Sequence, residues 1–231
     1  MNRVKLRNKR VLISGGSKGV GVYIAKAFSS AGAKVALLAR SESKMHNVSS
    51  SLPHESLVRP ADLSKPATLK KAVQRVAHAW GGIDVLVNNA VYYCEQDFLE
   101  VTQEEWDERV SVSLRGPYFL TQAVIPHMLA QGGGDVISIG AAVVQKPVAK
   151  GHLTEYAASK GGLTGFVRAL RDAYEPKGIR FSLVNPGWIY KGEETERHAK
   201  QVHAEEVART VLFLASLSPG HVIREITLET P

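Results

Sequence analysis

The chain has 231 residues, of which 44% are hydrophobic and 22% are charged, and its formal net charge at pH 7 is +7. This composition is typical of a soluble globular protein, and we expect one domain over residues 1–231. A single cysteine, Cys94, excludes an internal disulfide framework, and no apolar run reaches the roughly 18 residues of a membrane span. Because the basic N-terminus also lacks the apolar run of a signal peptide, we expect a cytoplasmic protein without a membrane partner.

Strand and helix patterns alternate along the chain. Short runs rich in Val, Ile and Leu predict strands at 10–14, 34–39, 83–88, 135–139 and 179–184, with weaker candidates at 56–60 and 224–229. Amphipathic patterns predict helices at 19–31, 66–79, 104–130, 155–175 and 204–216. This alternation is typical of βαβ units, and strands without polar alternation are typical of a parallel sheet covered on both faces. We therefore expect an α/β fold, a Rossmann-like doubly wound parallel sheet between two helix layers.

The stretch SGGSKGVG (14–21) directly follows the first predicted strand and opens the first helix. Gly15 permits a tight turn, Gly19 lets the backbone approach a pyrophosphate, and Gly21 lets helix and strand pack closely. The free N–H groups at the start of the helix then face the phosphate. The residues of this loop that we expect to bind a dinucleotide are Gly15, Ser17, Lys18, Gly19, Val20 and Gly21.

The second strand ends in Ala39 and Arg40. A carboxylate at this position would bind the ribose 2′-hydroxyl of NAD, whereas an arginine accommodates the 2′-phosphate of NADP. Arg40 and Lys18 therefore favour NADP(H), although both could simply be solvated surface charges. The remaining positive charge is scattered and not interleaved with aromatic residues, which argues against a nucleic-acid partner.

The stretch YAASK (156–160) places Tyr156 and Lys160 four residues apart in a predicted helix, so both can reach one ligand. A nearby ammonium favours the phenolate, and we therefore expect the pKa of Tyr156 to be lowered toward working pH. A tyrosine tuned in this way can exchange a proton with a carbonyl or alcohol oxygen.

Together with ADLS (61–64), NNA (88–90) and NPG (185–187), these motifs occur in an order that resembles the short-chain dehydrogenase/reductase family. The resemblance covers about residues 7–229 and implies a single domain with strand order 3-2-1-4-5-6-7. It implies that Tyr156 is the proton donor and that Lys160 holds the nicotinamide ribose. The further residues to which it gives a role in cofactor binding or support are Asp62, Leu63, Asn88, Asn89, Ala90, Pro186 and Gly187.

The chain departs from the pattern of that family beside the predicted catalytic pair. The serine that usually follows the fifth strand, and hydrogen-bonds the substrate carbonyl, aligns with Ala141. Losing one such donor typically costs about 10²–10³ in rate. The hydroxyl or imidazole groups that could replace it are Ser138, His152 and Thr154. Ser113 stands where the family usually has the asparagine of a proton relay, and Val91 stands where it prefers glycine.

The substrate side also differs from the resemblance. The segment 188–203 is shorter than the usual lid, which implies an open pocket or a bulky substrate, and Trp188 and Tyr190 are candidate pocket residues. The C-terminal tail also differs, so the tetramer contact common in the family is uncertain, although we expect a homo-oligomer, either a dimer or a tetramer.

The leading hypothesis is an NADP(H)-dependent oxidoreductase that reduces a carbonyl or oxidises an alcohol of a small-molecule substrate. One alternative is a protein that binds NADP(H) without turnover, and another is a non-redox isomerase or cyclase on the same fold. No metal site is expected, because the eight histidines are dispersed and one cysteine cannot form a zinc cluster.

Overall fold

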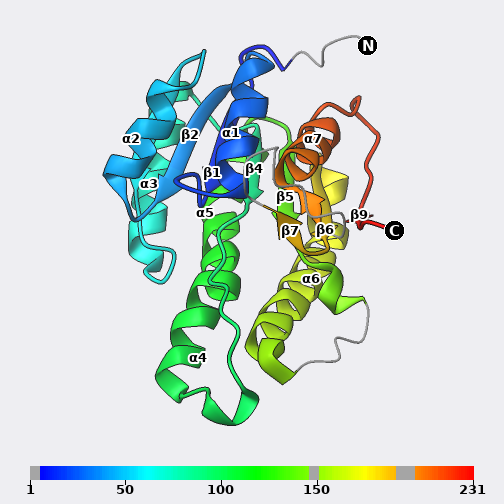
Figure 1. Cartoon of the computed structure of the whole chain (residues 1–231). Coiled ribbons are helices and arrows are strands. Elements are labelled where there is room, and N and C mark those ends of the chain that lie inside the picture. Colours follow the sequence, from blue (N-terminus) through cyan, green and yellow to red (C-terminus); the bar gives the residue numbers. More distant parts are fainter. Residues whose placement is uncertain (1–5, 146–150, 191–200) are drawn as a thin grey trace.

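The computed structural model describes residues 6–145, 151–190 and 201–231 and is built around a seven-stranded parallel sheet (Figure 1). The strand order is β3-β2-β1-β4-β5-β6-β9, which is the expected order 3-2-1-4-5-6-7 once the strands of this sheet alone are counted. The strands are β1 (Arg10–Ser14), β2 (Lys34–Ala39), β3 (Ser56–Pro60), β4 (Val85–Asn88), β5 (Gly134–Ile139), β6 (Ile179–Pro186) and β9 (Glu225–Leu228).

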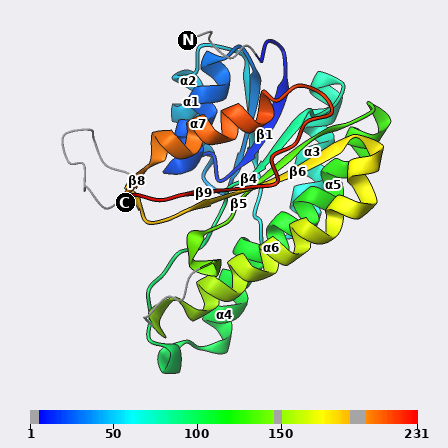
Figure 2. The same ribbon diagram turned by 90° about the vertical axis from the view of Figure 1, so that its right-hand side faces the viewer.

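Helices cover both faces of the sheet, as Figure 2 shows from the side. One layer contains α1 (Val20–Ser30), α2 (Glu42–Ser50) and α7 (Ala204–Ala215). The other contains α3 (Pro66–Trp80), α5 (Gly116–Ala130) and α6 (Thr154–Tyr174). Along β1, Val11 and Ile13 belong to the core beneath the first layer, while Leu12 belongs to the core beneath the second. Because successive side chains point to opposite faces and both faces are covered, the central strands are predominantly apolar.

The predicted helix at 104–130 differs from the structure. It consists of α4 (Gln103–Val110), a π-helical turn η2 (Ser111–Arg115) and α5 in direct succession. A side-chain pattern with a period of 3.6 residues does not reveal a local change to i→i+5 hydrogen bonding. The helix α2 was not predicted, because its sequence is polar and only Met45 and Val48 are buried.

Two further short strands, β7 (Ile189–Tyr190) and β8 (Val202–His203), pair with each other outside the main sheet. Both strands fall within the segment 188–203, which was expected to be a short lid, and residues 191–200 of that segment are outside the described residues. Among the helices in the described parts of the chain, none has both the length and the apolar character required to cross a membrane.

Candidate active site

The carboxyl ends of β1, β4, β5 and β6 meet at one edge of the sheet, where the predicted site residues follow them in the chain. This is the edge at which open α/β sheets bind their ligands. The glycine loop follows β1, Asn89 and Ala90 follow β4, Ala141 follows β5, and Gly187 follows β6.

The glycine loop has the backbone geometry that the sequence predicts. Gly15 and Gly19 have φ values of +70° and +56°, which residues with a side chain rarely adopt. A Cβ atom on Gly21 would lie 2.2 Å from the carbonyl oxygen of Gly15, so this close helix–loop contact requires glycine. The loop is tied to the sheet by the Gly15 N–H, which donates to the Leu38 carbonyl at 2.8 Å.

The first turn of α1 offers an anion-binding end. The N-cap residue, Gly19, has no side chain to cap the helix, and the first turn of α1 contains no acidic residue. The N–H groups and the positive end of the helix dipole are therefore available to a phosphate. The narrow glycine cradle and this helix end fit the pyrophosphate of a dinucleotide.

Ser14, which sequence reasoning missed, joins β1 to the loop after β4. Its hydroxyl accepts hydrogen bonds from the N–H groups of Asn89 at 3.1 Å and Ala90 at 3.2 Å, and it donates to the Val87 carbonyl at 3.3 Å. The Asn89 amide donates to the Ser14 carbonyl at 3.0 Å. These bonds place Asn89 and Ala90 against the glycine loop. The signal in the sequence that could have identified it is a serine at the end of a strand whose preceding three residues are apolar.

Asn88 instead supports the centre of the sheet. Its side chain is buried, and its amide donates to the hydroxyl groups of Thr121 at 2.9 Å and Ser138 at 3.3 Å. Ser138 lies inside β5, where its hydroxyl accepts this bond from Asn88, so it is held within the sheet and does not take the place of the missing hydroxyl.

Asp62 and Arg40 lie near each other beyond the ends of β3 and β2. One carboxylate oxygen of Asp62 accepts hydrogen bonds from the Ser64 N–H at 2.9 Å and the Ser64 hydroxyl at 2.8 Å. Burial alone would raise the pKa of Asp62, but these hydrogen bonds and the charge of Arg40 outweigh it, so the pKa lies below its usual value. Arg40 and Lys18 are exposed and form no hydrogen bond or ion pair with any residue that the structure describes, so both can meet a ligand.

Lys160 is buried at the end of β5. Its ammonium nitrogen donates to the carbonyl oxygen of Ile139 at 2.6 Å and lies 5.8 Å from the centre of the Tyr156 ring. Burial lowers the pKa of Lys160 to about 8. The structure thus brings Tyr156 and Lys160 together beside the end of β5, two residues before Ala141.

The expected lowering of the pKa of Tyr156 is wrong for this structure. Burial raises the pKa of Tyr156 to about 12, because the desolvated phenolate is disfavoured. The ammonium of Lys160 is engaged with Ile139 and does not offset that penalty. The tyrosine therefore keeps its proton at neutral pH.

Ala141 is buried, with 3% of its surface exposed, and its backbone is extended at φ −162° and ψ 143°. The other candidate groups are exposed or engaged elsewhere. His152 is exposed, and the Thr154 hydroxyl donates to the Glu155 carboxylate at 3.4 Å. The Ser113 hydroxyl accepts the Tyr92 N–H at 3.0 Å.

Tyr93, another residue that sequence reasoning missed, forms an aromatic row with Tyr156 and Trp188. Its ring centre lies 5.3 Å from that of Tyr156 and 6.5 Å from that of Trp188, both edge to face. Tyr93 and Trp188 are 42% and 55% exposed, so they offer aromatic surface next to the catalytic candidate. The Tyr93 hydroxyl donates to Glu95 at 2.6 Å. The side chain of Tyr190 is outside the described residues.

Pro186 and Gly187 end β6, and the Gly187 N–H donates to the Leu228 carbonyl of β9 at 2.8 Å. The turn that follows is therefore fixed by the edge strand of the sheet. A Cβ atom on Gly140 would lie 2.0 Å from the side-chain oxygen of Asn185, so the ends of β5 and β6 are packed closely here.

The doubly wound parallel sheet and the glycine loop at its switch point are typical of α/β domains that bind a dinucleotide. Residues 9–203 match the family described as short chain dehydrogenase. The chain belongs to the short-chain dehydrogenase/reductase family and is an oxidoreductase.

Characterised and uncharacterised relatives agree with this membership. The chain is 34% identical to an uncharacterised oxidoreductase of Schizosaccharomyces pombe, with 89% of this chain and 83% of the relative covered. It is 33% identical to the D-xylose 1-dehydrogenase of Caulobacter vibrioides, with 94% and 93% covered. A short chain dehydrogenase from Burkholderia cenocepacia, solved in complex with NADP, superposes with a TM-score of 0.87 at 30% identity, covering 99% of this chain and 98% of that one.

Proposed function

We propose that the protein is an NADP(H)-dependent oxidoreductase that interconverts a carbonyl and an alcohol, with Tyr156 and Lys160 as its catalytic residues. The observation that carries this proposal is the position of the two side chains. They share one face of α6, and Lys160 is bonded to the end of β5, on the sheet edge that also holds the glycine loop.

The bound cofactor supplies the hydride, or accepts it in the oxidative direction. The glycine loop and the first turn of α1 hold its pyrophosphate, while Asp62 and Leu63 lie at the adenine end. The full set of residues that we propose to bind it is Gly15, Ser17, Lys18, Gly19, Val20, Gly21, Arg40, Asp62, Leu63, Asn89, Ala90, Tyr156, Lys160, Pro186 and Gly187. Arg40 and Lys18 are unpaired among the described residues and can meet the 2′-phosphate, which favours NADP(H) over NAD(H).

The protonated state of Tyr156 favours one direction of the reaction at neutral pH. A phenol whose pKa is about 12 retains its proton and can donate it to the carbonyl oxygen during reduction. Oxidation of an alcohol requires the phenolate, which becomes available only as the pH rises. We therefore expect reduction to proceed near neutral pH and oxidation to accelerate in alkaline solution.

The substrate side offers aromatic surface and lacks one hydroxyl. Tyr93 and Trp188 provide flat apolar faces beside Tyr156, and the C–H face of a sugar ring is one group that could pack there. Because one relative is named as a D-xylose 1-dehydrogenase, D-xylose is the first alcohol to assay with this protein. Ala141 offers no hydrogen bond to a carbonyl oxygen, so turnover is expected to be slow.

A second candidate function is a protein that holds NADP(H) without turnover. It is favoured by Ala141 and by Ser113, whose hydroxyl is engaged with the Tyr92 backbone. A non-redox isomerase or cyclase has no observation of its own and would convert its substrate without any change in NADPH absorbance.

The test begins with fluorescence titrations of the protein with NADPH and, separately, NADH. Turnover is then followed at 340 nm with NADP⁺ and D-xylose, and with NADPH and reactive carbonyl compounds such as 2,3-butanedione. The proposal requires preferential NADPH binding and turnover that disappears in Tyr156→Phe. Tight NADPH binding without turnover in every assay supports the second candidate, and failure to bind either cofactor overturns both.

We also propose that residues 1–231 form one domain, that this domain assembles into a dimer or tetramer, and that it acts in the cytoplasm on a small-molecule substrate. The free Cys94 is compatible with a reducing compartment. Sedimentation velocity measures the assembly, and a single hydrodynamic species of monomer mass overturns that part of the proposal.

A further inference from the structure

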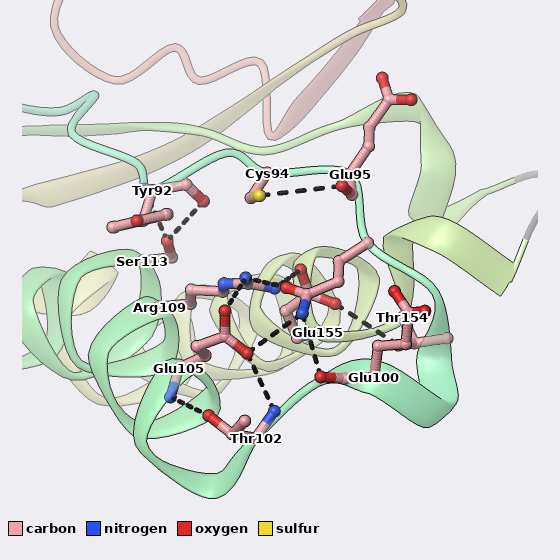
Figure 3. A network of polar contacts seen from close by, with 11 residues as sticks. Tyr92, Cys94, Glu95, Glu100, Thr102, Glu105, Arg109, Ser113, Thr154 and Glu155 are labelled. Carbon is pink, nitrogen blue, oxygen red and sulfur yellow. Dashed lines mark hydrogen bonds and ion pairs between the residues drawn. The ribbon is translucent and has the colours of Figure 1, made fainter.

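A buried ion pair joins Arg109 to Glu155, the residue directly before Tyr156 in the chain, and Figure 3 shows its two side chains. Arg109 near the end of α4 and Glu155 in the first turn of α6 are 4% and 2% exposed, and a guanidinium N–H donates to the Glu155 carboxylate at 2.8 Å. Because Glu155 immediately precedes Tyr156, this bond fixes the end of α6 from which Tyr156 projects. Burying two charges is costly, and replacing such a pair by apolar residues is often neutral for stability. Such a pair is therefore weak evidence for added stability, and the structure offers a second role for it in the geometry that it fixes.

The same guanidinium also holds the loop that follows β4. Arg109 donates to the side-chain oxygen of Gln96, and its guanidinium carbon lies 5.9 Å from the centre of the Tyr92 ring. The backbone N–H of Gln96 in turn donates to the carbonyl of His152, just before α6, at 3.1 Å. Arg109 thus connects α4, the loop and the start of α6.

The helix that carries Arg109 is itself anchored at its start. Thr102 and Glu105 form a capping box, in which the Thr102 N–H donates to the Glu105 carboxylate at 2.9 Å and the Glu105 N–H donates to the Thr102 hydroxyl at 3.2 Å. The other oxygen of the Glu105 carboxylate accepts from Arg109 at 3.3 Å. Through Glu105, the side chain of Arg109 is therefore connected to the first turn of α4, and Figure 3 draws these contacts.

The loop held in this way carries Tyr93 against Tyr156. Ser113 fixes the backbone of Tyr92 on one side, and Arg109 faces the ring of Tyr92. Tyr93 is the next residue, and its ring packs edge to face on Tyr156. Both the helix that bears Tyr156 and an aromatic residue in contact with it therefore depend on Arg109.

We propose that Arg109 is a positioning residue, which acts through Glu155 and the loop 92–96 to hold Tyr156 in its reactive place. This inference rests on the proposed function above. Without a serine at position 141, the substrate oxygen has one fewer hydrogen-bond donor to orient it, so the rate depends more strongly on the placement of the Tyr156 hydroxyl. A displacement of about 1 Å at a reacting group can cost about 10² in rate.

The experiment compares Arg109→Met, Arg109→Lys and Glu155→Gln with the unaltered protein. The matched control is Arg209→Met, because Arg209 also forms two ion pairs, with Glu205 and Glu206 at 2.9 Å, but lies exposed on α7. Steady-state kinetics use NADPH with 2,3-butanedione and NADP⁺ with D-xylose, and NADPH affinity is measured by fluorescence. Folding is checked by circular dichroism and thermal unfolding.

We expect Arg109→Met to lower kcat about tenfold or more, while KM and the Kd of NADPH change less than about twofold. Glu155→Gln lowers kcat in the same way, Arg109→Lys retains part of the activity because it keeps the charge, and Arg209→Met leaves kcat unchanged. If Arg109→Met does not fold, the Lys and Gln variants carry the comparison.

The outcomes separate this inference from the function on which it rests. Tyr156-dependent turnover that is equal in all Arg109 and Glu155 variants overturns the positioning role alone. A parallel loss of kcat, NADPH affinity and thermal stability also overturns it, because that pattern denotes a general structural role. Turnover that survives Tyr156→Phe, or no turnover in the unaltered protein, overturns the proposed function and this inference with it.

Discussion

Restoring a hydroxyl at position 141 should increase the activity of this protein. Ala141 lies two residues beyond Ile139, the last residue of β5, whose carbonyl oxygen accepts a hydrogen bond from the ammonium of Lys160. Its backbone is extended and unstrained, so serine can adopt it without rearrangement. A single oxyanion donor is typically worth about 10²–10³ in rate. Because Ser113 would still lack the reach of an asparagine, we expect Ala141→Ser to raise kcat by about 10–100-fold, or about 1.4–2.7 kcal/mol of transition-state stabilisation.

The same change should lower thermal stability. Position 141 is 3% exposed, so in the free protein the new hydroxyl is buried. A buried hydroxyl without a partner costs about 1–3 kcal/mol, which for a chain of this size corresponds to a fall in Tm of about 2–12 °C. A gain in kcat together with a loss of Tm is therefore the expected signature.

The matched control for this experiment is Ala142→Ser. Ala142 is also buried, and because position 141 is extended, the side chains of the two residues point in different directions. This control should lose stability without gaining activity, as measured by NADPH oxidation and thermal unfolding. If Ala141→Ser leaves kcat unchanged while Tyr156→Phe abolishes it, the reasoning about the missing donor is refuted. A gain at position 142 instead would refute the alignment of Ala141 with the serine of the family.

Three further results are expected. Arg40→Ala should weaken NADPH binding about 10–100-fold in a fluorescence titration and leave NADH binding almost unchanged, because it removes a charge-assisted contact to the 2′-phosphate; equal losses for both cofactors would contradict this. Lys160 has a pKa of about 8 in the folded protein, below the ordinary lysine value of 10.5, so its protonated form is penalised by folding and its contribution to stability improves as the pH rises from 8 to 10.5. As the pH rises across that interval, the Tm of the unaltered protein should therefore rise relative to that of Lys160→Met. A difference in Tm that does not change with pH would refute the lowered pKa of Lys160. Gly21→Ala places a Cβ atom 2.2 Å from the Gly15 carbonyl and should abolish NADPH binding in the same titration, whereas Gly165→Ala, with open space around it, should not affect it.

The sheet and the glycine loop could be predicted because their signals are local. Each buried strand is a continuous apolar run, and the predicted boundaries of β1, β2 and β3 agree with the structure. At positions 15 and 19 the positive φ angles of the backbone favour glycine. Such features need no knowledge of distant contacts.

The surroundings of Tyr156 could not be predicted in the same way, because they depend on residues far apart in the chain. Arg109 and Glu155 are separated by 46 positions, and in a polar helix an arginine looks like a surface residue. Tyr93 had no motif that would place it on Tyr156. The pKa of Tyr156 was predicted in the wrong direction because spacing shows that an ammonium is near, but not that burial outweighs it.

The π-helical turn η2 acts as a one-residue insertion in an otherwise continuous helix from Gln103 to Ala130. On its C-terminal side, Gly116 packs so closely on Leu63 that a Cβ atom would lie 2.8 Å from the Leu63 side chain. On its N-terminal side, Arg109 reaches Glu155. Deleting one residue of the turn would rotate these two halves by about 100° relative to each other and shift them by about 1.5 Å. In evolution, the length of this turn and an arginine at position 109 should therefore be gained or lost together.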